Sequence, residues 1–547
     1  MWVLTSKQAA MGVFSGSLLL LLATLAAYVY VSFKRKYKYW ERKGVAHVPP
    51  PSFLFGNTRD FTLMRRGIAG VLADIYKAAE GEPFVGLFQS RQPLLLARDP
   101  QFVRRVLVAD FAHFADRDVD VDERDNPVDS TNLIFLKGER WRALKMRITP
   151  TLSASKVRGM FATMAECASN MADGLRGPAA AGGSVEMRDV AGNYTTDIIG
   201  TCAFGLAIDS VRNPDSEFRR MGRKVFATTL GLVLRRLTII NYPAVGRLLR
   251  LSYFNTEVTG FFRRVVRDMV EHRQRNGVSR DDFLQQLIRL KRDGIVLEDR
   301  SADEDDEGLM QQLRDAGTGK EDKVFEITDD LLAAQCFVFF TAGYETSSAT
   351  MGFCLYELAL NPRVQERLRS EVDAALSAAT AGSTRDDGGC AITRECVQRM
   401  EYMDAVVHET LRKYPPVAVL TRGCTLPYNL PGASEPIEKG VRLFVSVYGI
   451  HHDPKYYPDP EKFDPERFLH QNKHRTRSPA YLPFGVGPRM CLGSRFGLLQ
   501  IKVGLAALLS KYQFDTATDT EIPLQLNPKS FILTPKNGVK LKISSRK

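Results

Sequence analysis

The stretch Phe-Gly-Val-Gly-Pro-Arg-Met-Cys-Leu-Gly, residues 484–493, combines three glycines and a proline with one arginine and one cysteine. Glycine and proline at this density predict an irregular loop. Residues 492–509 carry apolar side chains at helical spacing and predict a buried helix. Cys491 would then stand at a helix start, where free backbone N–H groups and the helix dipole favour a thiolate. A thiolate can bind a metal, whereas a lone cysteine beside a glycine turn can equally be a structural core residue.

The loop lacks the third glycine of a dinucleotide-binding fingerprint, which argues against a phosphate loop. Five of its positions resemble the haem-binding loop of the cytochrome P-450 superfamily: Phe484, Gly487, Arg489, Cys491 and Gly493. In that family one cysteine thiolate is the axial ligand of haem iron. The resemblance implies haem b ligated by Cys491, with Phe484 and Arg489 beside the cofactor. It also implies a mainly α-helical P-450 fold with small β-sheets.

The composition limits the kinds of binding partner and the redox state of the cellular compartment that are consistent with the sequence. The 547 residues are 44% hydrophobic, enough for a large core, and the net charge of +12 calls for nucleic acid, a lipid surface or an acidic protein nearby. The cysteines show no paired C-x-x-C spacing, which indicates a reducing compartment without a disulfide framework or a zinc site. They are Cys167, Cys202, Cys336, Cys354, Cys390, Cys396, Cys424 and Cys491.

The N-terminus predicts a membrane anchor. Residues 8–33 carry no charge, and as a helix they would be about 39 Å long, enough to cross a bilayer. The basic residues come afterwards, with aromatic residues among them, so the body would face the cytosol. A cleaved signal peptide is the alternative, but its basic residues would come first. The basic flank consists of Lys34, Arg35, Lys36, Lys38, Arg42 and Lys43.

We divide the chain into an anchor (1–33), a basic and proline-rich linker (34–52) and a haem-thiolate catalytic domain (53–547). The prolines at 49–51 predict a stiff, extended connector. Anchor, basic stretch and prolines together resemble the microsomal branch of the family, which implies the endoplasmic reticulum membrane. Residues 197–205 predict a core helix and resemble the insect detoxification branch.

Residues 138–147 predict a helix with Trp141 and Lys145 one turn apart on one face. An indole donor and a cation together suit a carboxylate. The resemblance implies that this pair holds a haem propionate, with Arg422 and Arg489 as further propionate ligands. Lys145 departs from the family pattern, in which arginine is usual, because lysine lacks the bidentate fork.

Thr328, with acids behind it, predicts the start of a long buried helix. This helix would include Ala342-Gly-Tyr-Glu-Thr346. Thr346 can hydrogen-bond back to the Ala342 carbonyl, and Gly343 would leave the surface open beside it. Such a back-bond is common and by itself carries no function. The motif resembles the family's oxygen-activating motif, which implies that Thr346 positions dioxygen and water while Glu345 relays protons.

Glu409 and Arg412 lie three residues apart on a predicted helix, a spacing that chance surface pairs share. Together with Arg467 they resemble the family's buried ionic triad. We assign them to structure behind the haem loop. Removal of one partner would leave a buried charge unpaired and block haem retention.

Residues 114–132 begin as Phe-Ala-Asp-Arg and continue as a polar, acidic stretch, which predicts a mobile loop. The resemblance implies a lid over the substrate pocket. Residues 298–307 and 377–389 predict exposed, flexible connections. The implied pocket residues, for which core packing is the alternative, are Ile134, Phe135, Ala342, Val417, Ala418, Val419, Phe531 and Ile532.

Basic residues on the helix of Trp141 and at 473–477 would present a positive surface to an acidic electron donor. The resemblance implies a flavin-containing NADPH–cytochrome reductase, with a cytochrome b-type donor as a second source. The reaction would be insertion of one oxygen atom from O2 into lipophilic substrates. Resemblance to the insect branch implies xenobiotic substrates such as plant toxins and insecticides. The alternatives are oxidation of endogenous steroids or fatty acids, isomerase or dehydratase chemistry, a non-catalytic membrane haem protein and nucleic-acid binding.

Overall fold

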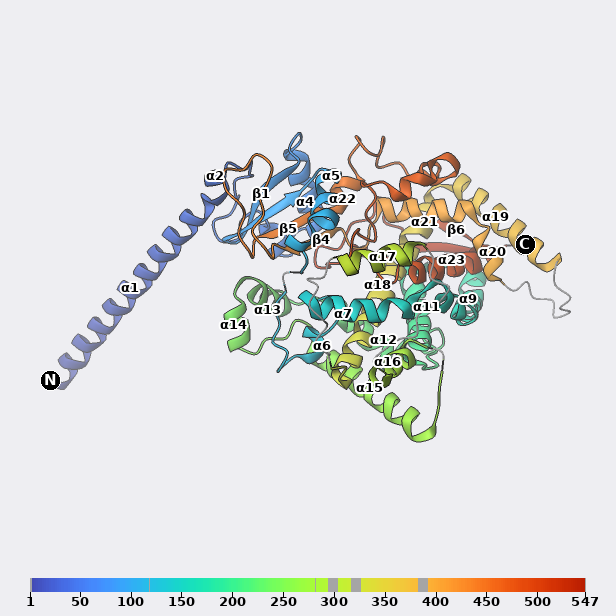
Figure 1. Ribbon diagram of the computed structural model, residues 1–547, viewed down its shortest axis with the longest axis horizontal. Helices are drawn as coiled ribbons and strands as arrows, with labels where there is room; N and C mark the ends of the chain where they lie inside the picture. Colours follow the sequence, from blue (N-terminus) through green and yellow to red (C-terminus); the bar gives the residue numbers. More distant parts are fainter. Residues whose placement is uncertain are drawn as a thin grey trace.

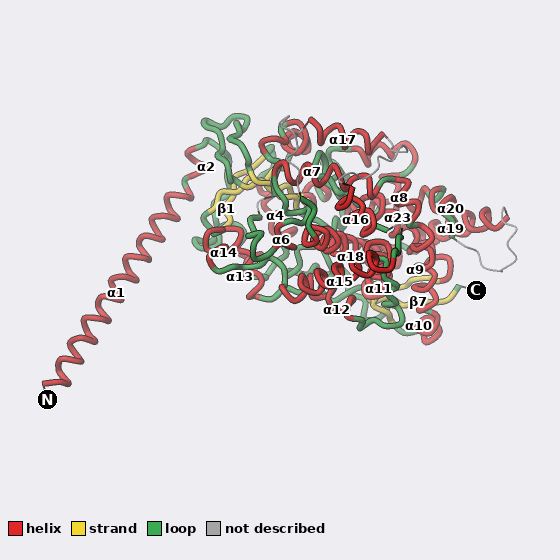
Figure 2. Tube along the Cα trace, turned by 60° about the horizontal axis from the view of Figure 1, so that its bottom comes forward, coloured by secondary structure: helices red, strands yellow, loops and turns green. Residues whose placement is uncertain are grey.

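A computed structural model describes residues 2–117, 119–280, 282–293, 304–315, 326–381 and 392–546. The fold is mostly helical with two small sheets, as the sequence predicts. Helix α1 (Trp2–Tyr37) projects from the body at the end where the larger sheet lies, and the C-terminus lies at the opposite end (Figure 1). Turning the molecule shows the same arrangement, with most of the helices beyond the sheet (Figure 2).

The helices follow one another along the whole chain. After α1, those of the first half are α2 (Tyr39–Arg42), α3 (Arg59–Thr62), α4 (Ile68–Ala78), α5 (Pro100–Arg104), α6 (Pro127–Ser130), α7 (Gly138–Ile148), α8 (Ala154–Gly159), α9 (Phe161–Gly174), α10 (Arg176–Ala181), α11 (Met187–Ile199), α12 (Glu217–Phe226), α13 (Leu230–Asn241), α14 (Pro243–Leu248) and α15 (Thr256–Asn276). Those of the second half are α16 (Phe283–Asp293), α17 (Glu304–Asp315), α18 (Asp329–Leu360), α19 (Pro362–Ala381), α20 (Arg394–Gln398), α21 (Glu401–Lys413), α22 (Val447–His451) and α23 (Ser494–Lys511).

The larger sheet has the strand order β1-β2-β5-β4. Strand β2 pairs with β1 in antiparallel fashion and with β5 in parallel, with Leu94 opposite Arg442. The smaller sheet has the order β3-β7-β6 and is antiparallel throughout. The strands are β1 (Phe84–Gln89), β2 (Gln92–Ala97), β3 (Ser184–Glu186), β4 (Val419–Gly423), β5 (Arg442–Ser446), β6 (Tyr512–Thr516) and β7 (Lys540–Ser545).

Helix α18 is the centre of the helical part. Its start is as predicted, because the Thr328 hydroxyl accepts a hydrogen bond from the Leu331 N–H at 3.2 Å. The helix is apolar around most of its circumference, the pattern of a helix buried on all sides. It packs against α11, α15, α21 and α23. The longest buried helix of the described residues therefore packs against α23, the helix that follows the loop at 484–493.

Helix α1 continues the predicted apolar segment into the basic flank. Residues Gly16–Arg42 are long and apolar enough to cross a membrane, and little of the segment is buried against the body. The leucines at 18–22 are exposed. An apolar surface of this length needs a non-aqueous neighbour, so α1 is a candidate membrane anchor.

The linker after α1 lies against the larger sheet. Trp40 is fully buried, and its indole N–H donates to the Leu87 carbonyl at 2.8 Å. The side-chain amide of Asn57 donates to the Val48 and Pro49 carbonyls. The Val48 N–H also donates to the Gly86 carbonyl of β1 at 3.0 Å, so the proline segment is hydrogen-bonded to the body and is not a free spacer.

Two predicted connections are partly helical. Helix α17 includes residues 304–307, and α19 continues through residue 381, so at these positions the expectation of a flexible connection is wrong. Residues 298–303 and 382–389, together with Cys390, lie outside the described residues. Residues 200–204, which were expected to extend a core helix, form a π-helical end to α11.

Candidate functional site: a cysteine loop beside a long helix

The loop at 484–493 turns tightly before α23. The Cys491 N–H donates to the Phe484 carbonyl at 2.9 Å and closes the loop. Gly487 has φ +75°, and a Cβ there would stand 2.1 Å from the Leu107 carbonyl oxygen. The glycine is therefore required by both backbone conformation and space. The loop holds Cys491 two residues before the Gly493 N-cap of α23.

Cys491 differs from the other described cysteines because its side chain is exposed while theirs are buried or half-buried. The surrounding protein nevertheless raises the pKa of its thiol, and the Gly493 N–H, Lys145 and Arg117 only counteract that effect. Although the side chain opens to solvent, the protein atoms packed around the sulfur desolvate it, and this outweighs the lowering by the Gly493 N–H and the cations, so the helix start by itself does not produce the thiolate. Coordination of a metal ion would remove the thiol proton.

Four cationic side chains lie within electrostatic range of one another beside Cys491. They are Arg117, Lys145, Arg422 and Arg489. Burial, together with the positive charges of the three arginines, lowers the pKa of Lys145 to about 7. Among the described residues, one carboxylate forms an ion pair with these four cations: that of Asp116, 3.0 Å from the Arg489 guanidinium. The cluster therefore carries an excess of buried positive charge.

Two of these cations, Lys145 and Arg489, donate most of their hydrogen bonds to groups of the protein. The Lys145 ammonium donates to the Pro488 and Met490 carbonyls at 2.5 and 2.9 Å. Arg489 stacks 3.8 Å from the Trp141 ring centre and also donates to the Ala115 and Leu136 carbonyls. Trp141 and Lys145 share one buried face of α7, as predicted. Their role as propionate ligands remains a prediction.

Arg422 has the spare donor that a bound anion needs. It comes from β4, and its Nη1 donates to the Thr421 carbonyl at 2.8 Å. Its Nε is buried without a hydrogen-bond partner in the described structure. A buried unpaired donor is costly, and a carboxylate would satisfy it. An accessible thiol beside an excess of buried cations fits haem, which offers an iron atom and two propionates.

Helix α18 passes beside the start of α23. The side-chain amide of Gln500 donates to the Gly343 carbonyl at 3.2 Å, so the two helices are joined at this level. Ala342 is exposed, Thr346 is half-buried, and the Thr346 hydroxyl donates to the Ala342 carbonyl at 2.6 Å. The predicted back-bond is therefore present on an open face of the helix.

Gly343 serves a different purpose from the one expected. A Cβ at this position would lie 2.5 Å from the Ile199 side chain at the end of α11. The glycine lets α11 and α18 approach each other, so it does not leave an open surface beside Thr346, and that expectation is wrong. The open position beside Thr346 is Ala342.

Glu345 points into a buried polar network. Its carboxylate is 2% exposed and pairs with Arg188 of α11. The adjacent Tyr344 hydroxyl accepts a hydrogen bond from the buried Arg219 of α12. Any movement of protons by Glu345 would begin from this ion pair.

The triad residues meet behind the loop. The Arg412 guanidinium donates to both carboxylate oxygens of Glu409 at 2.8 and 2.9 Å, and neither side chain is exposed. Arg467, in the short 3₁₀ turn at Pro465–Phe468, lies 3.5 Å from the same carboxylate. Its Nη2 donates to the Pro458 and Asp459 carbonyls. The network ties α21 to the segment that precedes the cysteine loop.

Histidines around this network are buried in the neutral form. Burial lowers the pKa of His408 to about 4 and that of His452 to about 3, and it also lowers the pKa of His451 well below its ordinary value. In the unfolded chain all three would titrate near pH 6.5. Below about pH 6.5 the unfolded chain therefore binds protons that the native protein does not bind, and stability falls by about 1.4 kcal/mol per pH unit for each histidine.

We therefore expect the thermal unfolding midpoint of the detergent-solubilised protein to fall steadily between about pH 6.5 and about pH 4. His452→Phe, measured in parallel by circular dichroism, should show a shallower decline because one titrating site is gone. A midpoint that is constant over this range would contradict burial of neutral histidines.

The acidic stretch at 114–132 is held by ion pairs in its described part. Asp120 pairs with Arg247 of α14 at 2.8 Å, and Glu123 pairs with Arg140 of α7 at 2.7 Å. Both pairs are exposed, and such pairs contribute about 0–1 kcal/mol each. The lid role remains a prediction.

The predicted pocket residues differ in burial and in their contacts. Phe135 joins an aromatic cluster through contacts with Tyr253 and Phe254, and Phe254 reaches Phe337 of α18. Ile134 is half-buried, and its carbonyl accepts a hydrogen bond from Arg117. Val417 is half-buried, whereas Ala418, Val419 and Ile532 are buried.

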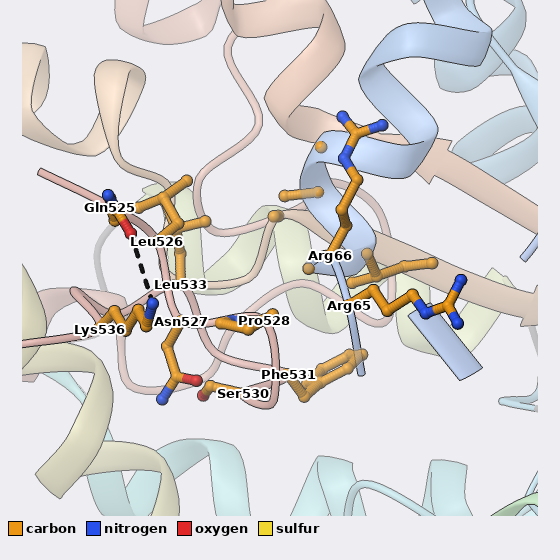
Figure 3. A pocket seen from close by; sticks show the side chains of 15 residues that line it. Arg65, Arg66, Gln525, Leu526, Asn527, Pro528, Ser530, Phe531, Leu533 and Lys536 are labelled. Carbon is orange, nitrogen blue, oxygen red and sulfur yellow. Dashed lines mark hydrogen bonds between the residues drawn. The ribbon is translucent and has the colours of Figure 1, made fainter. Parts of the chain in front are cut away.

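Phe531 lies elsewhere, half-exposed on a cavity of about 330 Å³ between the start of α4 and the C-terminal loop (Figure 3). Ala418 also lines this cavity, whereas Cys491 and Thr346 do not. Its assignment to the substrate pocket remains a prediction.

Sequence reasoning assigned no role to two residues of the site. Arg117 ends the Phe-Ala-Asp-Arg motif and stands directly before an acidic stretch, and this position was a usable signal. Arg188, the partner of Glu345, follows a helix start and gave no such signal. Both meet their partners only through tertiary packing.

An accessible cysteine beside buried cations, near a helix that carries a neighbouring acid and hydroxyl, is an arrangement that fits a haem-thiolate site. The model of the cytochrome P450 family matches residues 47–543, and the chain belongs to this family. It is 37% identical over 523 residues to cytochrome P450 6k1 of Blattella germanica, and the aligned region covers 96% of both chains. It is 38% identical over 531 residues to probable cytochrome P450 6a13 of Drosophila melanogaster, covering 96% of this chain and 98% of the relative.

Cytochrome P450 6A1 of Musca domestica is 34% identical over 537 residues, covering 97% of this chain and 98% of the relative. All three relatives come from insects, which agrees with the resemblance drawn from residues 197–205. The chain is thus a haem-thiolate monooxygenase of the cytochrome P450 family.

Proposed function

We propose that the protein is an NADPH-dependent monooxygenase of the endoplasmic reticulum that oxidises lipophilic xenobiotics such as plant toxins or insecticides. The observation that carries the proposal is the Thr346 hydroxyl on the open face of α18, joined through Gln500 to the helix that follows Cys491. A haem-thiolate protein that only carried haem would not need this hydroxyl or an adjacent buried acid. Similarity to insect relatives supports the substrate class.

Haem would supply activation of dioxygen at an iron atom whose thiolate ligand donates electron density. The chain's own residues would bind the haem and transfer protons to the site. Cys491 would ligate the iron, and Arg422, with its free Nε, would bind a propionate with support from Trp141, Lys145 and Arg489. Thr346 would hold a water or oxygen species by its hydroxyl, and Glu345 would pass a proton when its pairing with Arg188 loosens.

Electrons would come from NADPH through a flavin-containing reductase, with a cytochrome b-type protein as a second donor. Part of the predicted basic surface is neutralised, because Arg140 pairs with Glu123 and Lys473 pairs with Glu401. Arg477 is exposed in the stretch that precedes the cysteine loop. A surface with remaining positive charge supports an acidic donor.

Two apolar surfaces support the membrane location. One is helix α1. The other is formed by α13 and α14, where the side chains of Leu230, Leu234 and Leu248 are exposed by 56, 55 and 80%. These helices lie at the same end of the body as α1 in both views (Figures 1 and 2). Exposed apolar side chains beside an anchor favour contact with lipid.

The test is Thr346→Ala in the full-length protein, reconstituted with purified reductase and a lipophilic probe substrate. We expect haem content to be unchanged and product formed per NADPH to fall about tenfold or more, because proton delivery at this position contributes about 10²–10⁴-fold. The lost electrons should appear as peroxide. Thr346→Ser, which keeps the hydroxyl, should remain coupled.

Tight coupling in Thr346→Ala would rule out the positioning role of the hydroxyl. Absence of NADPH consumption by the native protein with reductase would favour a non-catalytic haem protein instead.

A further inference from the structure

His451, at the end of α22, is fully buried behind the cysteine loop. Its two ring nitrogens face different partners. Nδ1 lies 3.0 Å from the Arg412 carbonyl oxygen, and Nε2 accepts a hydrogen bond from the Leu482 N–H at 2.8 Å. The ring also stacks on Tyr481, with 5.6 Å between centroids and 12° between planes.

These partners determine the tautomer. A carbonyl oxygen only accepts, so Nδ1 must carry the proton, and a backbone N–H only donates, so Nε2 must offer its lone pair. The neutral Nδ1–H imidazole satisfies both groups at once. A phenylalanine would fill similar space but leave a buried carbonyl and a buried N–H unpaired.

The two bonds connect the buried ion pair to the cysteine. On one side, the Arg412 side chain donates to the His451 carbonyl at 3.0 Å, so the two residues hold each other reciprocally. On the other side, Leu482 stands two residues before Phe484, whose carbonyl accepts the Cys491 N–H at 2.9 Å. The Leu482 carbonyl also accepts the Gly485 N–H at 3.1 Å.

We propose that His451 is a positioning residue that fixes the entry of the cysteine loop against α21 and thereby keeps Cys491 in place to ligate haem iron as a thiolate. This inference deepens the proposed function and rests on ligation by Cys491. The triad holds α21 to the segment before the loop, but it is the His451 ring that bonds to the backbone at the loop entrance.

His452 provides a matched control. It is also buried, its pKa is lowered by burial as well, and it stacks on Tyr448 with 4.0 Å between centroids. In the described part of the chain its ring hydrogen-bonds to the Tyr448 carbonyl one turn earlier. His451→Phe and His452→Phe therefore remove the same buried group next to each other, and only the first removes a contact to the cysteine loop.

The experiment compares both variants with the native full-length protein in membranes. Carbon monoxide difference spectra of the reduced proteins give the ratio of thiolate-ligated to neutrally ligated haem, and circular dichroism gives the folded fraction. We expect His451→Phe to lower that ratio about tenfold at equal folded fraction, whereas His452→Phe leaves it close to native. Equal ratios in the two variants would overturn the proposal.

Amide variants keep the proposal testable if His451→Phe does not fold. Asparagine can retain a donor near the position of Nδ1, whereas glutamine can place an acceptor near that of Nε2. We expect His451→Gln to keep more thiolate-ligated haem than His451→Asn, because the Leu482 bond is the one that reaches the loop. The reverse order would overturn the proposal. A native protein without the thiolate-type band would instead refute ligation by Cys491.

Discussion

Cys491→Ala should yield a folded protein that has lost thiolate-ligated haem completely. The variant deletes the one exposed thiol among the described cysteines, and the cysteine loop offers no other sulfur ligand except the neutral thioether of Met490. Fold stability should change little, because an exposed side chain contributes little apolar burial. The carbon monoxide difference spectrum of the reduced membrane protein measures the outcome directly.

Cys167→Ala is the control for Cys491→Ala. It removes a half-buried thiol from α9, away from the cysteine loop, and should keep the red-shifted Soret band of the native protein. A native-like band in Cys491→Ala would return this cysteine to a structural role. It would also remove the basis for every catalytic role proposed above.

Arg412→Met should abolish accumulation of the haem-loaded protein. It leaves the unexposed carboxylate of Glu409 with the more distant Arg467, and breaking a buried pair in this way costs about 3–5 kcal/mol. It also frees the His451 carbonyl, which accepts from Arg412. A loss of this size is a large fraction of the stability of a typical domain, which is about 5–15 kcal/mol. Haem content per polypeptide and resistance to limited proteolysis measure the loss.

Lys473→Met provides the contrast to Arg412→Met. Lys473 pairs with Glu401 at 2.8 Å, but both side chains are about half exposed. Water and salt screen such an exposed pair, so it contributes little to stability and haem content should stay near native. If Arg412→Met retained haem as well as Lys473→Met does, the triad would not support the loop.

The sequence was most informative where a feature is local. The helix start at Thr328, the back-bond of Thr346 and the shared face of Trp141 and Lys145 all follow from spacings within one or two helical turns. The glycine loop around Cys491 is similarly a matter of backbone conformation over ten residues. Such patterns depend on geometry that the chain carries with it wherever it packs.

Predictions failed where the neighbour comes from a distant segment. Gly343 was expected to open a surface, but Ile199 occupies the space beside it. The helix start at Cys491 was expected to favour the thiolate, but desolvation by the surrounding protein raises the pKa of its thiol.

The sequence by itself determined the family, the cysteine ligand candidate, the apolar anchor and the chemical types of the site residues, because motifs and periodicity are local properties. Only the tertiary structure decided that Arg117 joins the buried cations, that Glu345 pairs with Arg188 and that His451 links Arg412 to Leu482. These contacts join segments that lie far apart along the chain. Their formation depends on how helices and loops pack, and no local spacing encodes that packing.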